Sequence, residues 1–101
     1  MTALFSIARS GLQAAQLRMD SSAHNVANMN TPGFRSQVVD LQAAQQPGGV
    51  QARVATPAAT PGVALEQEAV QQVSATYAFK ANALVLRRAD DMAGALLDVR
   101  A

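Results

Sequence analysis

His24 is the only histidine of this 101-residue chain, and cysteine is absent. Metal sites that need two imidazoles, cysteine–histidine dyads and thiol chemistry are therefore excluded. The remaining nucleophilic arrangement pairs His24 with Ser21 or Ser22 on one predicted helix, where nothing supplies an oxyanion hole. We interpret His24 as an ordinary polar helix residue and expect no catalytic residue. A His24→Ala substitution should leave the function intact unless an enzymatic reading is correct.

The close carboxylates, Glu66 with Glu68 and Asp90 with Asp91, do not form an acid–base pair. Residues one or two apart on a helix point away from each other, so neither pair shares a proton well, and we expect both to be solvated. The pair Gly48-Gly49 lacks the spacing and the following lysine of a phosphate-binding loop. The sequence therefore predicts a non-enzymatic protein with no cofactor, no metal site and no small-molecule substrate.

Composition limits the remaining function classes. Eight basic residues nearly balance seven acidic ones, without the basic face of a nucleic-acid binder, so we expect no nucleic-acid partner. No apolar run reaches the roughly 20 residues of a transmembrane helix, and residues 1–11 lack the basic start of a cleaved secretory signal. Alanine supplies 22 residues but buries little area, so we expect packing against other chains to add stability.

The residues with potential roles lie in two long segments with a helical pattern. From about residue 3 to 29, apolar or small residues recur in alternating steps of three and four, the heptad period of a helix packed along a seam. Thr31-Pro32-Gly33 then ends the helix, because proline disfavours the helical conformation before it and glycine permits positive φ. The seam comprises Phe5, Ala8, Leu12, Ala15, Met19, Ser22, Val26 and Met29.

A second long helix is predicted from about Leu65 to Val99. Two neighbouring seams along it make a face wide enough for more than one partner helix, and Tyr77 is expected in the core or an interface. One seam is Leu65, Ala69, Gln72, Thr76, Phe79, Ala83, Leu86, Asp90, Ala93 and Leu97, and the other is Ala78, Asn82, Val85, Ala89, Met92, Leu96 and Val99.

The middle segment is short. Residues 36–41 and 50–54 have strand-like patterns on either side of Pro47-Gly48-Gly49, which favours a small β-hairpin. A competing interpretation is a helix over Val39–Gln46, whose residues have good helix propensity. Residues 55–62, with two prolines, are expected to form an extended, mobile linker. The predicted fold is mainly α: two long terminal helices, as an antiparallel hairpin or coiled-coil bundle, joined by a β-hairpin or irregular insert and this Pro/Ala linker.

Two motifs resemble the flagellar rod and hook axial protein family. The first is Asn25-Val26-Ala27-Asn28-Met29-Asn30-Thr31-Pro32-Gly33-Phe34, similar to the asparagine-rich turn that ends the family's N-terminal helix. The second, Ala75 to Leu86 followed by Ala89-Asp90-Asp91-Met92, looks like the family's C-terminal helix. His24 stands where the family commonly has another asparagine. The short middle segment and the opening Phe5 to Leu12 point toward a short proximal rod protein.

The resemblance implies three parts: an axial helix and turn (1–34), an insert and linker (35–64), and a second axial helix (65–101). It also implies a structural subunit of the flagellar basal-body rod in the periplasm, exported by the flagellar type III apparatus without a cleaved signal. Its partners would be itself and other axial proteins. Asn25, Asn28 and Asn82 are candidates for buried polar contacts that fix register, and Phe34 for an anchor of the turn in an apolar niche. The helix-packing residues are Phe5, Ala8, Leu12, Ala15, Met19, Val26, Tyr77, Phe79, Asn82, Val85, Leu86, Met92 and Leu96.

A second hypothesis is a coiled-coil adaptor or regulator that kept the axial helices but does not polymerise. The two hypotheses differ in valence. A rod subunit needs heterologous contacts that extend into a helical array, whereas an adaptor should form a closed dimer or a one-to-one complex.

Overall fold

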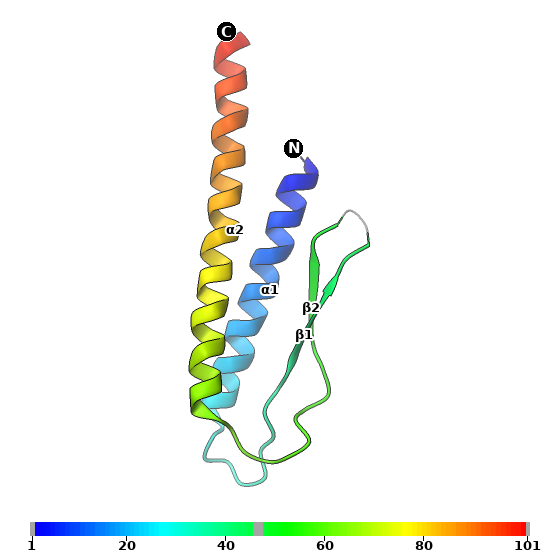
Figure 1. The fold of residues 1–101 in the computed structure, drawn as a ribbon, viewed down its shortest axis with the longest axis vertical. Coiled ribbons are helices and arrows are strands. Elements are labelled where there is room, and N and C mark those ends of the chain that lie inside the picture. The colour runs from blue at the N-terminus through cyan, green and yellow to red at the C-terminus, as the bar shows by residue number, and fades with distance from the viewer. Residues whose placement is uncertain (1, 46–47, 101) are drawn as a thin grey trace.

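The computed structural model describes residues 2–45 and 48–100, which form two long helices and one β-hairpin (Figure 1). The elements are α1 (Thr2–Ala27), β1 (Val39–Ala43), β2 (Val50–Val54) and α2 (Leu65–Arg100). The molecule is elongated, with extents of 64 × 25 × 14 Å. The predicted mainly helical fold is confirmed, and α1 ends two residues before the predicted boundary. Over the described residues, neither helix combines the length and hydropathy needed to cross a membrane.

The helices α1 and α2 run antiparallel and differ in length. Helix α1 has 26 residues and α2 has 36, so α2 continues past the N-terminal end of α1 (Figure 1). Ten extra residues correspond to about 15 Å of helix. This part of α2 has no α1 residue beside it.

Small side chains form the contact between the two helices. The buried apolar residues are all alanines: Ala8, Ala14, Ala15, Ala75 and Ala89. Near the middle of the pair, a Cβ added at Gly11 would lie 2.6 Å from Cγ and Nδ2 of Asn82. Alanine and glycine allow helices to approach closely but bury little apolar area, so this helix pair has a thin core.

The β-hairpin is antiparallel, with five residue pairs from Val39↔Val54 to Ala43↔Val50. Strand β2 has the predicted bounds, whereas β1 begins at Val39 and continues to Ala43. The competing helix over Val39–Gln46 is wrong for the described part, because Val39–Ala43 pairs with β2; Gln46 and Pro47 lie outside the described residues. Gly48 and Gly49 both have positive φ, which suits the end of a hairpin.

The hairpin lies against the N-terminal half of α1. The backbone N–H of Val50 donates to Oγ of Ser10 at 3.0 Å, and this hydroxyl donates to the Ile7 carbonyl at 2.7 Å. A Cβ added at Gly49 would clash with Ser10 Oγ and lie 3.3 Å from Cα of Ile7. Ser10 therefore replaces solvent as the acceptor for a strand N–H, and Gly49 permits the close approach.

Gly49→Ala should consequently detach the hairpin tip from α1. Gly49 has φ +94°, and an alanine there is strained in addition to its clash with Ser10. We expect a loss of about 1–2 kcal/mol in the free energy of unfolding and faster hydrogen exchange at the Val50 amide. Gly62→Ala is the matched control, since Gly62 has φ +110° with no atom within 4 Å of the added Cβ. Equal exchange rates at Val50 in both variants would contradict the docking.

The linker runs beside the segment that enters β1. Backbone N–H groups of Ala55, Ala58 and Gly62 donate to the carbonyls of Val38, Ser36 and Phe34, at 2.7, 3.0 and 2.8 Å. The linker is therefore extended, as predicted, and three hydrogen bonds hold it to residues 34–38. Its predicted mobility and the division at residues 34 and 64 stay predictions.

Candidate functional site

The asparagine-rich turn begins where α1 ends, and the Asn28 side chain caps the helix. Its Nδ2 donates to the His24 carbonyl at 2.9 Å, so a side chain satisfies a carbonyl of the last helical turn. The backbone then folds sharply, with Thr31 N–H donating to the Asn28 carbonyl and Phe34 N–H donating to the Thr31 carbonyl. Gly33 has φ +73°, which its lack of a side chain permits.

Asn25 is the buried centre of this end of the molecule, with 1% of its surface exposed. Its Oδ1 accepts from the Gln37 backbone N–H at 2.7 Å, and its Nδ2 donates to the Gln37 carbonyl at 3.0 Å. The same Nδ2 donates to Oε1 of Glu68 at 2.9 Å. One side chain thus joins α1 to the strand-entry segment and to the first turns of α2.

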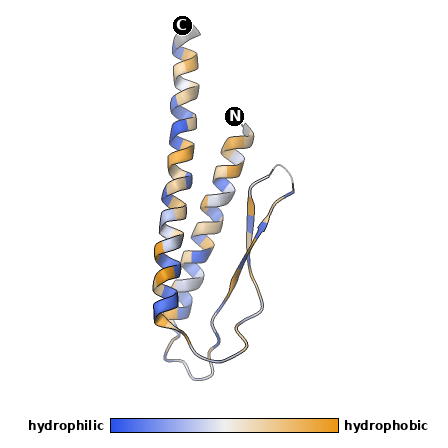
Figure 2. Ribbon diagram, viewed as in Figure 1, coloured by the Kyte–Doolittle hydropathy of each residue, from blue (hydrophilic) through white to orange (hydrophobic). Residues whose placement is uncertain are grey.

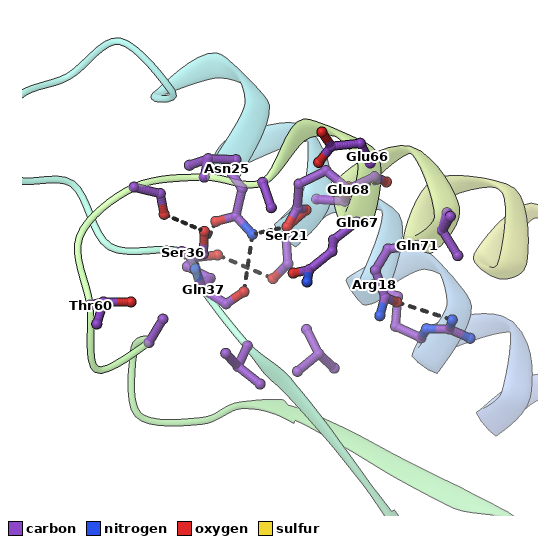
Figure 3. Close-up of a pocket in the computed structure, with 18 of the residues that line it drawn as sticks. Arg18, Ser21, Asn25, Ser36, Gln37, Thr60, Glu66, Gln67, Glu68 and Gln71 are labelled. Carbon is purple, nitrogen blue, oxygen red and sulfur yellow. Dashed lines mark hydrogen bonds between the residues drawn. The ribbon is translucent and has the colours of Figure 1, made fainter.

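Three further side chains complete what we call the Asn25 cluster, made of Ser21, Ser22, Asn25, Gln37 and Glu68 (Figure 3). Ser22 Oγ donates to the Glu68 carbonyl at 3.1 Å, and Ser21 Oγ donates to Gln37 Oε1 at 3.1 Å. Four members, all except Gln37, are buried. The cluster is a polar junction of three chain segments, and its hydrogen bonds fix where the chain turns back along the helices.

Glu68 corrects the expectation of a solvated carboxylate pair. Glu66 is exposed, but only 8% of the Glu68 surface is exposed. The reason is the phase of α2: Glu68, Ala75, Asn82 and Ala89 follow at intervals of seven, and the helix turns them toward α1. The sequence did hold this signal, but alanines on the neighbouring seams obscured it.

His24 lies beside Phe34 at the turn. Their ring centroids are 5.5 Å apart in an edge-to-face arrangement with an interplanar angle of 63°. His24 is exposed, and its Nδ1 lies 3.5 Å from Asn28 Nδ2. Phe34 is half-buried against this ring. Among the described residues no group of three or more His, Asp or Glu side chains is placed to hold a metal ion.

The predicted motif and packing residues occupy several environments. Ala27, Asn30, Thr31, Pro32 and Gly33 are exposed in the turn. Ala8 and Ala15 are buried, and a larger group is half-buried: Phe5, Leu12, Met19, Val26, Asn28, Asn82 and Leu86. A third group is exposed on α2: Tyr77, Phe79, Val85, Met92 and Leu96. Intermolecular contacts of this third group stay a prediction.

The sequence reasoning did not identify Gln37, Gly11 or Ser10. Gln37 contacts Asn25 mainly through its backbone, and the other two contribute a missing side chain and a single hydroxyl. Only Gly11 carried a signal, as the one glycine inside the first heptad pattern.

One family of known proteins matches this region. Residues 5–35 match the model of the family described as flagella basal body rod protein, a span that includes nearly all of α1 and the complete turn. This match confirms the resemblance to the flagellar rod family. No curated protein matches the sequence.

Proposed function

We infer, from a chain whose residues 5–35 carry the segment of the flagellar basal body rod family, that this protein is a structural subunit of the flagellar rod. In this role it works by packing its helices against those of neighbouring subunits, and no residue acts as a catalyst. The observation that carries the proposal, beside the family match, is a stripe of exposed apolar side chains on α2.

This outer stripe consists of Val70, Val73, Tyr77 and Leu84, spaced by three, four and seven residues. Such spacing places the four side chains on one face of a helix, roughly opposite the Glu68, Ala75, Asn82 and Ala89 face. Between 52% and 70% of each residue's surface is exposed. An apolar stripe with heptad spacing is typical of a helix that packs in a bundle, which supports a partner helix on this side of α2.

A second exposed surface lies where α2 continues past α1. Met92, Leu96 and Leu97 are each more than 60% exposed there. Figure 2 shows hydrophobic segments along α2, including this part. Two different apolar surfaces on one chain favour heterologous contacts, which extend into an array, over a single self-complementary interface.

The finer features of the proposal follow the family. The rod partners are other axial proteins and further copies of this chain, and the position is the proximal part of the rod. The chain reaches the periplasm through the flagellar export apparatus without a cleaved signal. The short β-hairpin supports the proximal position, because it leaves no large outer domain between the two helices.

Tyr77→Asp tests the outer stripe. Tyr77 is 70% exposed, so the variant should keep the free energy of unfolding within about 0.5 kcal/mol of wild type. A charge in the proposed interface should prevent incorporation into isolated basal bodies, measured by immunoblot against an internal rod component. Arg87→Asp is the control, since Arg87 is also exposed on α2 but lies off the stripe. Normal incorporation of Tyr77→Asp would contradict this interface, and a closed dimer that never enters basal bodies would favour the adaptor hypothesis.

A further inference from the structure

One carboxylate oxygen of Glu68 is buried without a hydrogen-bond partner. Oε1 accepts from Asn25 Nδ2, whereas Oε2 has no partner among the described residues. The residue is more than nine-tenths buried, so bulk water does not replace the missing donor. Leaving a buried charged acceptor unpaired is unfavourable, and the exceptions in native structures often mark a binding site.

Glu68 lines a cavity of about 860 Å³ at the base of the helix pair (Figure 3). The cavity lies between the helices and the two extended segments, residues 36–39 and 58–64. Four valines line it together with the polar residues: Val38, Val39, Val63 and Val70. A carboxylate together with apolar walls suits a side chain that has an apolar stem and a cationic end.

The charges around the cavity are unbalanced. Glu66 and Glu68 both line it, and the single cationic residue in its lining is Arg18. The Arg18 guanidinium is already engaged, because Nη2 donates to Ser74 Oγ at 2.9 Å and to Gln71 Oε1 at 3.3 Å. Arg18 therefore makes its hydrogen bonds to neutral acceptors on α2 and leaves Glu68 Oε2 for another donor.

We propose that this cavity receives a lysine or arginine side chain of a neighbouring rod subunit, whose cationic end donates a hydrogen bond to Glu68 Oε2. The methylene stem lies along the valines, and the charged hydrogen bond satisfies the unpaired oxygen. The proposal rests on the proposed function, since it names one contact by which this subunit engages a neighbour. Glu68 is thus both a member of the Asn25 cluster and a receptor for a partner.

A solution experiment tests the chemistry on the full chain. The probes are Nα-acetyl-arginine methylamide and its neutral analogue Nα-acetyl-citrulline methylamide, followed through the side-chain amide NMR signals of Asn25 and Gln37. We expect saturable shifts with the arginine compound and at least about tenfold weaker binding of the citrulline compound. Glu68→Gln, which keeps an acceptor for Asn25, should remove the preference, and Glu66→Gln should keep it. Equal responses to both compounds in the wild type, which need no variant, would overturn the proposal.

A cellular arm identifies the source of the cation and separates this proposal from the proposed function. In a strain lacking the gene, Glu66→Gln should restore rods and Glu68→Gln should not, provided that urea unfolding shows both variants folded. Restored rods with Glu68→Gln would overturn the cation site alone, whereas complete rods without the gene would overturn the proposed function. Spermidine is the probe for a free cation: tighter binding of spermidine than of the arginine compound, with rods restored by Glu68→Gln, would overturn the assignment to a neighbouring subunit.

Discussion

Asn25→Ala should lower the free energy of unfolding by about 2–4 kcal/mol, the largest effect that we expect from one side chain in the turn region. The substitution removes three hydrogen bonds, two to the Gln37 backbone and one to Glu68 Oε1. Each buried group left without a partner costs about 1–3 kcal/mol. Urea unfolding followed by circular dichroism at 222 nm measures the change.

Two variants show whether burial causes this effect. Asn30→Ala changes the same residue type in the same turn, but Asn30 is exposed, so the change should stay within about 0.5 kcal/mol. Asn28→Ala removes the cap on α1 and should cost about 1 kcal/mol. If all three variants lose the same stability, the Asn25 cluster does not hold the three segments together in the way described.

Gly11→Ala should destabilise the helix pair by about 2 kcal/mol, although alanine is the better helix former. The added Cβ lies 2.6 Å from Cγ and Nδ2 of Asn82, a distance that forces the helices apart or the amide out of place. Overpacking of this kind costs about 1–3 kcal/mol and outweighs the gain of roughly 1 kcal/mol in helix propensity. Thermal and urea unfolding of the single variant give the net effect.

The same substitution should have the opposite sign once Asn82 is shortened. In an Asn82→Ala background the clashing atoms are gone, and Gly11→Ala should then stabilise the chain by up to about 1 kcal/mol. The two changes would be coupled by about 2–3 kcal/mol in a double-mutant cycle. Gly94→Ala is a control, since Gly94 lies in α2 and the added Cβ meets no atom within 4 Å. Additive effects at Gly11 and Asn82 would mean that the helices are not in close contact there.

The secondary structure was predictable from the sequence because its signals are local. The heptad pattern and the Thr31-Pro32-Gly33 stop predicted α1, and the alternating strand patterns around Gly48-Gly49 predicted the hairpin. The start of β1 was three residues off, because residues 36–38 pair with the linker and the end of the chain's turn instead of with β2. Such pairing depends on where the linker returns, which no local pattern specifies.

The Asn25 cluster was only partly predictable. The turn motif drew attention to Asn25, but its partner Gln37 contributes backbone atoms, which every non-proline residue has. The burial of Glu68 depends on the rotational phase of α2. Alanines occur on several faces of this helix, so small residues alone do not distinguish the α1-facing seam from its neighbours. Long-range packing decided what the pattern left open.

The most direct test of the rod assignment is electron microscopy of basal bodies, together with motility, in a strain that lacks this gene. The strain is complemented with the wild-type chain or with Asn28→Ala plus Phe34→Ala, which removes the helix cap and the ring beside His24. We predict a non-motile strain with truncated basal bodies, full rescue by the wild-type gene, and no rescue by the double variant. Normal swimming and complete rods without the gene would contradict the assignment and direct attention to a separate partner for the exposed face of α2.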